Sequence, residues 1–532
     1  MVSRIPRGVL ALAGAVAVLG FLIGAGYGLE ALFGSPSPAP LPALPGAVRP
    51  QPNASANPIV AENAKPGTTA WQIANVAGSA GIEGYADHTS ATQGETVTLF
   101  VSTRAAHFTV QAYRMGYYGG LGGRLVWTSP DEPGVQQAPA AVQAGTNMAT
   151  ANWKASLSVH IDASWTPGDY LLKLVGDGGQ QRYIPLTVID PSSTAPLVVV
   201  NAVTTWEAFN DWGGYNLYFG PNQAAQNRST VVSFDRPYAS AGGGNESGDG
   251  SGDFLGDEFP LVYFAESYGL DVTYVTDVDL DEDGAQLLAG RSGVITLGHD
   301  EYWSAAMRTA VTGAEDHGVN LAFLGANAMY QQIRLQPSAL GPDRQIVDYK
   351  NAAADPIAAT NPSAVTVPWR DPPVSDPESS VIGELFACNP ATPAPAVVVD
   401  AGNWLFTDTG IRNGDTFPNL IGPYYDQVNP AFTTPADVEV LAHSPVTCQK
   451  VQSYADMTYY SAPSGAGVFA TGTTGWVCEL TASCLQDPRP HPDLRILQIT
   501  RNLLVAFASG PAGTAHPSKS NLASLGIAKA TP

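Results

Sequence analysis

The sequence predicts two domains of different class, an all-β domain over residues 70–190 and an α/β domain over residues 195–510. In the first region, short segments alternate between apolar and polar residues and are separated by turn residues, which is typical of antiparallel strands. In the second, continuous apolar runs alternate with helical patterns, which is typical of βαβ units around a mainly parallel sheet. The length of 532 residues also exceeds one domain of ordinary size.

The all-β prediction rests on five alternating segments. Strands of this length at short intervals favour an immunoglobulin-like sandwich. The segments are residues 96–101, 108–113, 157–161, 170–174 and 183–188.

A segment rich in glycine and aromatic residues, Tyr113 to Arg124, lies inside this domain and contains five glycines. Glycine allows a sharp turn or a close approach of two backbones. The segment is either a loop presented to the next domain or to a ligand, or a wide hairpin over the edge of the sandwich. The hairpin is favoured, because aromatic residues in loops often pack across domain interfaces.

The α/β prediction rests on an alternation of strands and helices, which is the βαβ alternation of a doubly wound sheet. A later apolar segment, residues 496–508, is expected to be a helix that packs on this layer. The expected strands are 197–200, 271–275, 293–296 and 319–324, the expected helices 259–269 and 303–317, and shorter strands are expected at 397–399, 438–441 and 467–473.

The two ends of the chain have other signatures. Arg4 and Arg7 precede a long apolar run, so residues 1–30 are expected to be a secretory signal peptide or an uncleaved membrane anchor. Residues 31–69 are expected to be a Pro/Ala-rich linker, and residues 511–532 a disordered tail. The body is therefore expected to be extracytoplasmic, either secreted or anchored by the N-terminal segment.

The formal net charge of −22 argues against a nucleic-acid partner, because phosphate binding requires a basic surface. It also argues against adhesion to an anionic membrane, so membrane contact is expected through the N-terminal segment only. The sequence indicates no particular oligomeric state.

Four cysteines lie late in the chain, and an even number in an exported protein suggests two disulfides. Pairing Cys478 with Cys484 closes a short loop and leaves Cys388 with Cys448. Three pairings are formally possible. The absence of a C-x-x-C motif makes a zinc knuckle improbable.

The strongest candidate site is the stretch 297–303, which follows the expected strand 293–296. It brings His299, Asp300 and Glu301 to the carboxyl end of a strand, where ligands bind in open α/β sheets. The alternative is a helix N-cap, with a carboxylate near the amides of the first turn.

A second stretch, residues 204–218, follows the first strand of the α/β region and contains Asn210, Trp212 and Tyr218. Loops from two strand ends of one sheet can meet over one crevice. An aromatic, amide-rich pocket can hold a small organic ligand or a sugar. A phenol oxygen such as that of Tyr218 beside Glu301 can bind a hard ion such as ferric iron, if the ion displaces a proton whose pKa is roughly 10.

Several common catalytic motifs are absent from the sequence: no G-x-S-x-G elbow, no Walker loop and no H-E-x-x-H occurs. Asp279 to Gly284 matches the first half of a calcium loop. However, position twelve would be Gly290 rather than a bidentate glutamate, which disfavours calcium there.

Taken together, these motifs resemble those of the N,N-dimethylformamidase large-subunit family. The resemblance covers about residues 75 to 510. It implies a β-sandwich followed by an α/β domain like that of class I glutamine amidotransferases, and hydrolysis of a small tertiary amide at a mononuclear iron held by two tyrosines and one glutamate. The residues concerned are 113–120, 212–214 with 217–218, 299–303, and 325–327 followed by Arg334.

The resemblance assigns the glutamate to Glu301 and one tyrosine to Tyr218. The second tyrosine should precede Tyr218, where this chain has Trp206 and Phe209, neither of which can ligate iron. Tyr215 and Tyr238 are the substitutes that the sequence offers.

Two functions follow from the sequence. The first is an exported amidase-like hydrolase, with Tyr218 and Glu301 as metal ligands and His299 or Asp300 as the proton-transfer group. In that function, Asn210, Trp212 and Asn327 would contact the substrate. The second is a non-catalytic envelope protein that kept the fold, lost the metal site and binds a ligand or a glycan.

Overall fold

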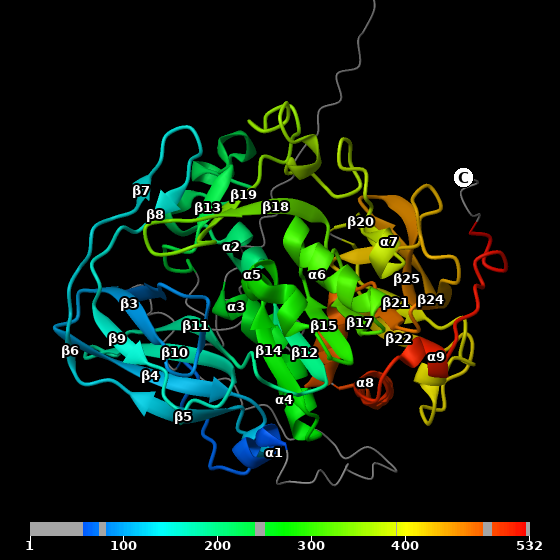
Figure 1. Cartoon of the computed structure of the whole chain (residues 1–532), viewed down its shortest axis with the longest axis horizontal. Helices are drawn as coiled ribbons and strands as arrows, with labels where there is room; N and C mark the ends of the chain where they lie inside the picture. The colour runs from blue at the N-terminus through cyan, green and yellow to red at the C-terminus, as the bar shows by residue number, and fades with distance from the viewer. Residues whose placement is uncertain (1–56, 74–80, 240–249, 390, 482–491, 528–532) are drawn as a thin grey trace, which may run out of the picture. The chain divides into compact units, whose positions relative to one another are not determined.

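The computed structural model describes residues 57–73, 81–239, 250–389, 391–481 and 492–527 (Figure 1). The N-terminal part forms two antiparallel sheets, as the alternating segments predict. One has the strand order β1-β3-β9, and the other β2-β11-β10-β4-β5, with β6 beside β4; only the short β2–β11 pairing is parallel. These strands are β1 Ile82–Ala86, β2 Ser90–Thr92, β3 Thr96–Thr103, β4 His107–Met115, β5 Gly123–Thr128, β6 Glu132–Pro133, β9 Leu157–His160, β10 Gly168–Gly176 and β11 Gln181–Ile189.

A mostly parallel sheet organises the following region, with the order β14-β12-β15-β17-β26-β25-β24. The first five strands pair in parallel, and β25 and β24 continue the sheet in antiparallel. This confirms the mainly parallel sheet expected from the apolar runs. The strands are β12 Leu197–Asn201, β14 Val272–Thr276, β15 Gly293–Gly298, β17 Asn320–Gly325, β24 Glu439–Cys448, β25 Val451–Ser461 and β26 Gly467–Ala470.

Helices cover both faces of this sheet. Alternate strand residues point to opposite sides, so each face presents its own side chains to the helices. Leu197 and Val199 belong to one core cluster together with residues of α4 and α8, whereas Val198 and Val200 belong to a second cluster with residues of α5 and α6. Burial on both faces explains why β12 reads as a continuous apolar run. The helices are α2 Val203–Phe209, α4 Phe259–Ser267, α5 Asp277–Leu287, α6 Ala305–Asp316 and α8 Leu494–Ala508.

Helix α5 contains the acidic segment 279–284, where the sequence matches half of a calcium loop but disfavours calcium. The segment is helical. The helix begins with a capping box. The Thr276 side chain accepts from the Asp279 N–H, and the Asp279 carboxylate accepts from the Thr276 N–H. Carboxylates in the first turn also suit the helix dipole.

A four-stranded sheet beside the parallel sheet positions the candidate site. Its order is β13-β19-β18-β16, and β16 and β18 run in parallel directly after β15 and β17. Its strands are β13 Val231–Ser233, β16 Tyr302–Ser304, β18 Gln331–Gln336 and β19 Gln345–Val347.

The remaining elements are short. The expected Cys388–Cys448 disulfide is present and joins β20 to β24. The short strands are β7 Ala141–Val142, β8 Ala149–Thr150, β20 Leu385–Cys388, β21 Ala394–Val397, β22 Thr416–Ile421 and β23 Tyr425–Gln427, and the short helices α1 Pro58–Asn63, η2 Tyr118–Gly120, η3 Trp212–Gly214, η4 Pro221–Gln223, η5 Ala225–Asn227, α3 Ser251–Asp253, η6 Phe254–Glu258, η7 Pro362–Ala364, α7 Ser379–Ile382, η8 Trp404–Phe406, η9 Thr474–Leu480 and α9 Ala512–Ala515.

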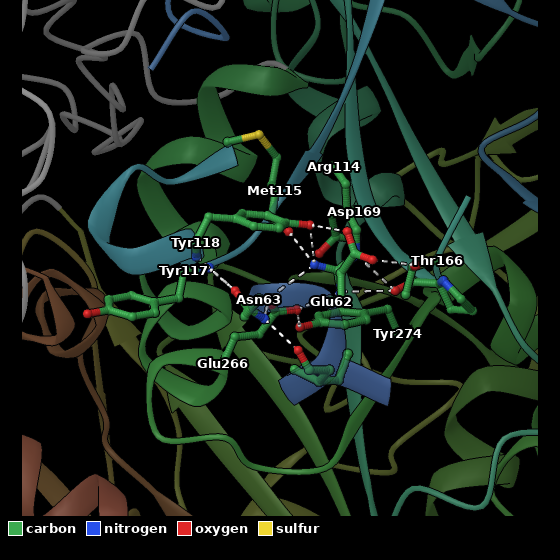
Figure 2. A network of polar contacts seen from close by, with 12 residues as sticks. Glu62, Asn63, Arg114, Met115, Tyr117, Tyr118, Thr166, Asp169, Glu266 and Tyr274 are labelled. Carbon is green, nitrogen blue, oxygen red and sulfur yellow. Dashed lines mark hydrogen bonds and ion pairs between the residues drawn. The ribbon is translucent and has the colours of Figure 1, made fainter. Parts of the chain in front are cut away.

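The glycine-rich segment is a hairpin between β4 and β5, as favoured from the sequence, and it also joins the sandwich to the α/β region. Figure 2 shows the polar network at this junction. Arg114 bridges to Glu266 of α4 with Nη2–Oε1 at 2.7 Å, and both side chains are fully buried. Helix α1 completes the network, because Asn63 donates to Glu266 and Glu62 accepts from the Tyr118 hydroxyl.

The ends of the chain differ in part from expectation. Residues 1–30, most of the expected linker and Cys484 lie outside the described residues. In the part of the chain that is described, no helix has the length and apolar character needed to span a bilayer. The expected disordered tail is wrong for residues 512–527. There, Asn521 exchanges two hydrogen bonds with the backbone of Val440, and Leu522 is buried in the core.

Candidate functional site

Three strand ends of the parallel sheet bring the candidate residues together. His299 follows β15, Asn327 follows β17, and Tyr218 lies in the chain after β12 and α2. Because β12, β15 and β17 are parallel neighbours, their carboxyl ends meet at one edge. Gly298 and Gly325 are cross-strand partners there, and a Cβ on Gly325 would lie 2.0 Å from the Gly298 carbonyl oxygen.

Tyr218 and Glu301 form the centre of the site. The Tyr218 hydroxyl lies 2.8 Å and 2.9 Å from the two carboxylate oxygens of Glu301, which is 3% exposed. The Tyr302 hydroxyl donates to the Tyr218 oxygen at 2.6 Å, and Lys350 Nζ donates to the Tyr302 oxygen at 2.7 Å. The same ammonium group lies 3.6 Å from the centre of the Tyr218 ring. The result is a continuous chain of polar contacts from Lys350 to Glu301.

His299 and Asn327 extend this chain on the other side of Glu301. His299 Nε2 lies 3.2 Å from Glu301 Oε2 and 3.1 Å from Asn327 Nδ2. Asn327 adopts a left-handed backbone with φ of 60°, and its N–H donates to Asp426 Oδ1 at 2.9 Å. Its side-chain Oδ1 is buried and has no partner among the described residues. A strained backbone that presents an unsatisfied carboxamide is typical of a ligand site.

Aromatic rings surround the histidine. The His299 ring lies 4.6 Å from the Tyr424 ring and 5.3 Å from the Phe209 ring. Phe209 also stacks on Tyr218 at 4.7 Å. His299, Tyr218, Phe209 and Tyr424 are all partly exposed, whereas Glu301 below them is buried. The buried carboxylate therefore lies in contact with partly exposed rings.

The charges around Glu301 keep it ionised. Burial alone would raise the pKa of Glu301, but the hydrogen bond from His299 and the positive charge of Lys350 outweigh burial and lower it. Burial and the negative charge of Glu301 raise the pKa of Tyr218 and of Tyr302 well above the usual value. Burial lowers the pKa of Lys350, although Asp348 and Glu301 oppose that shift.

Asp300 does not face this cluster. It is 1% exposed, and its Oδ1 accepts from the Trp303 indole N–H at 2.8 Å. Successive residues of an extended segment point to opposite sides, so His299 and Glu301 share one side and Asp300 takes the other. Burial raises the pKa of Asp300 to about 7. Among the described residues, the Asp300 carboxylate hydrogen-bonds to Trp303 rather than to a group of this cluster.

The structure also places Asn210 and Trp212 away from Glu301. The Asn210 side chain is buried, accepting from the N–H groups of Trp212 and Ala239 and donating to Glu207 and the Pro237 carbonyl. The Trp212 indole donates to Glu83 of β1 at 2.9 Å and packs edge-on against Trp153. Asn210 thus holds the chain around α2 together, and Trp212 joins it to the N-terminal sheets.

Sequence reasoning missed Tyr302 and Lys350. Tyr302 lies inside the stretch 297–303, but the family resemblance implies a second tyrosine that precedes Tyr218. Tyr302 is the tyrosine whose hydroxyl contacts that of Tyr218. Lys350 follows β19, and no local motif marks it. Only the pairing of β19 with β18 brings that segment toward β16.

The oxygen donors suit a hard metal ion. The phenols of Tyr218 and Tyr302 and the Glu301 carboxylate lie within hydrogen-bonding distance along one chain of contacts. Oxygen-only donors of this kind fit ions such as ferric iron. In the described ranges, no group of three or more His, Cys, Asp or Glu side chains is arranged to hold a metal. A metal at this site would thus depend on tyrosine ligands.

Of the comparisons with known proteins, the match to a family model identifies the family. A search of curated proteins gives no match. Among solved structures, a Paenibacillus sp. cycloisomaltooligosaccharide glucanotransferase in complex with cycloisomaltoheptaose matches at 6% identity, with a TM-score of 0.16, over 45% of this chain and 44% of that one, so this chain spans less than half of its length. A family model described as N,N-dimethylformamidase beta subunit-like, C-terminal, matches residues 109–489, well over half of the chain. The chain therefore belongs to the N,N-dimethylformamidase beta subunit-like family.

Proposed function

We propose that this protein is an exported amide hydrolase that acts on a small amide C–N bond at the Tyr218–Glu301–His299 site. One observation carries the proposal: the Tyr218 hydroxyl contacts both oxygens of a buried, ionised carboxylate, and His299 lies 3.2 Å from that same carboxylate. In this proposal, these groups serve as an acid, a base and an orienting charge at one strand end.

His299 and Glu301 are the base in this proposal. The imidazole removes a proton from the attacking water, and the carboxylate at Nε2 stabilises the imidazolium that forms. His299 is partly exposed, so water can reach it, whereas the buried Glu301 holds its orientation. The proton then passes to the leaving amine.

Tyr218, Tyr302 and Lys350 are the donors. A raised pKa keeps each phenol protonated in the metal-free site, and Lys350 supplies positive charge at the end of the chain. Lys350 can stabilise the oxyanion that develops on the amide carbonyl, and the phenols share that role only while no metal has displaced their protons. The unpartnered Oδ1 of Asn327 can accept from an N–H or O–H of the ligand.

The donor set fits the iron of the family. Tyr218, Glu301 and Tyr302 would hold it, with Tyr302 taking the place of the second tyrosine that the residues Trp206 and Phe209 do not provide. When bound, iron would supply Lewis-acid polarisation of the amide carbonyl.

The proposal extends to fold type and location. The paired antiparallel sheets support an immunoglobulin-like sandwich, and the parallel sheet with helices on both faces supports an α/β domain like that of class I glutamine amidotransferases. The Cys388–Cys448 disulfide supports an oxidising, extracytoplasmic location.

The test combines metal analysis with turnover. The wild-type protein and Glu301→Gln, Tyr218→Phe and Tyr302→Phe variants are analysed for iron, for visible tyrosinate-to-iron absorption, and for amine release from a panel of small formamides and acetamides. We expect near-stoichiometric iron in the wild type, loss of absorption in both tyrosine variants and loss of turnover in Glu301→Gln.

Trp212→Phe is the matched control, because this aromatic residue lies outside the site; it should retain iron and activity. The metal assignment would be wrong if the wild type contained less than about a tenth of an equivalent of iron and Glu301→Gln contained the same amount. Absence of amine release from every amide, together with ligand or glycan binding that Glu301→Gln abolishes, would replace the hydrolase by the non-catalytic binding protein.

A further inference from the structure

A second buried group of oxygen atoms lies where the sandwich meets the parallel sheet. It comprises Asp169 of β10, Asn201 at the end of β12 and Glu258 at the end of η6, which are 3%, 0% and 1% exposed. Asn201 Nδ2 donates to Asp169 Oδ1 at 2.5 Å and to Thr187 at 2.9 Å. The three residues come from segments far apart in the sequence, so only the folded chain forms this group.

Glu258 is oriented toward the same strand end. Its Oε1 accepts from the Ala202 N–H and from the Trp206 indole N–H, both at 3.0 Å. Ala202 is the neighbour of Asn201 in the chain. These two bonds fix one carboxylate oxygen and leave the other, Oε2, without a partner among the described residues, while the charge of Asp169 acts on the same carboxylate.

Each of the three residues has one polar atom without a partner. Asp169 Oδ2, Asn201 Oδ1 and Glu258 Oε2 are buried and form no hydrogen bond within the described parts of the chain. All three atoms are oxygens that accept but cannot donate when the carboxylates are ionised. Buried polar atoms normally find a partner, so three such acceptors together indicate a missing positive group.

No basic side chain of the described ranges forms an ion pair with Asp169 or Glu258. Arg114 is the cation that most lowers the pKa of Asp169, but its N–H groups bind Glu266, Tyr118 and two backbone carbonyls. Burial nevertheless raises the pKa of Asp169 to about 7. Burial, together with the charge of Asp169, raises the pKa of Glu258 well above its usual value.

We propose that Asp169, Asn201 and Glu258 bind a divalent cation of the calcium type at the junction of the sandwich and the parallel sheet. Two carboxylate oxygens and one amide oxygen are the donors that Ca²⁺ prefers, and two negative charges match a divalent ion. The site contains no histidine or sulfur donor, which disfavours zinc and copper. It shares no residue with the Tyr218–Glu301 site and does not depend on the hydrolase proposal.

Terbium luminescence tests this site directly, because Tb³⁺ replaces Ca²⁺ and can be excited through a nearby tryptophan. Trp206 donates to Glu258 and is therefore positioned as the sensitiser. The full chain is titrated with Tb³⁺ under tryptophan excitation and then with Ca²⁺ as competitor, and Tm is measured in parallel with Ca²⁺ and with EDTA. We expect half-saturation by Ca²⁺ between about 0.1 and 1 mM, the range of extracellular calcium modules, and a Tm that rises with Ca²⁺.

Glu258→Gln and Asp169→Asn remove one charge each while keeping shape, and each should weaken Ca²⁺ binding at least about ten-fold. Glu384→Gln is the matched control, since Glu384 is also a 0% exposed carboxylate and is not part of this group. It should leave Tb³⁺ emission unchanged.

Three outcomes overturn the proposal: no Ca²⁺-competed emission up to about 10 mM Ca²⁺, equal loss in the control, or unchanged binding in both site variants. If the variants do not fold, the competition on the wild-type chain decides alone. A Tm that depends on pH but not on Ca²⁺ would mean that a proton, not a metal, neutralises the pair.

Discussion

Loss of Arg114 tests whether the buried network joins the sandwich to the α/β region. Arg114→Met keeps an apolar stem of similar length but removes the guanidinium. Glu266 then keeps its bonds from Asn63 at 2.7 Å and Tyr274 at 2.8 Å, but it loses both contacts with Arg114. Its charge would stay at 0% exposure with neutral donors only.

The expected cost follows from burial rather than from distance. Removing one partner of a buried pair typically costs about 3–5 kcal/mol, because the other charge is left uncompensated. The Arg495–Asp493 pair has a similar separation, 2.6 Å, but its side chains are 32% and 24% exposed. Arg495→Met should therefore cost less than about 1 kcal/mol.

The stability of Arg114→Met and of Arg495→Met is measured by urea unfolding, which is monitored by circular dichroism. A change in the midpoint at constant m is taken as a change in the free energy of unfolding. The double variant Arg114→Met/Glu266→Leu should be less destabilised than Arg114→Met alone, since it leaves no buried charge unpaired at this bond. Two results would refute the reasoning. One is a cost of Arg114→Met no larger than that of Arg495→Met. The other is a double-variant cost equal to the sum of the costs of Arg114→Met and Glu266→Leu measured separately.

Three further predictions follow from other contacts. Hydrogen bonds and cations around Glu62 outweigh burial and lower its pKa to about 2. The stability that Glu62 contributes is therefore complete above its unfolded pKa near 4.5 and is lost as the pH falls toward 2. In acid unfolding, Glu62→Gln should lack this dependence of roughly 2–3 kcal/mol. Gly325→Ala should cost about 1–3 kcal/mol in urea, because its Cβ would overlap the Gly298 carbonyl, and an unchanged midpoint would contradict the close approach. Cys448→Ser opens the disulfide to Cys388 across 60 residues and should cost about 4 kcal/mol by chain entropy; equal midpoints for oxidised wild type and variant would contradict this.

The strands were predictable because their side chains face one core or two. The alternation at 96–101 became β3, in which Val97, Leu99 and Val101 face the main core of the N-terminal sheets, and the apolar run at 197–200 became β12, buried on both faces. Helix α5 was missed because its acidic residues resemble a calcium loop, although Thr276 followed by Asp279 is a capping pattern visible in the sequence. The tail was missed because Asn521 and Leu522 show no periodicity and are ordered by contacts with β24.

The candidate site was predictable where it lies at strand ends and not where tertiary pairing creates it. His299, Glu301 and Tyr218 follow apolar runs, and parallel strand order brings them together. The direction of Asp300 depends on the backbone between β15 and β16, which composition does not specify. Lys350 reaches Tyr302 only because β19 pairs beside β18.

Helix α1 has a mechanical consequence. A pulling force applied to the chain before Asn57 would reach the six residues of α1 before either sheet. Glu62 and Asn63 would oppose that force through bonds to the β4–β5 hairpin and to α4 at once. The load would therefore be divided between the β4–β5 hairpin and α4, the two elements that the Arg114–Glu266 pair also joins.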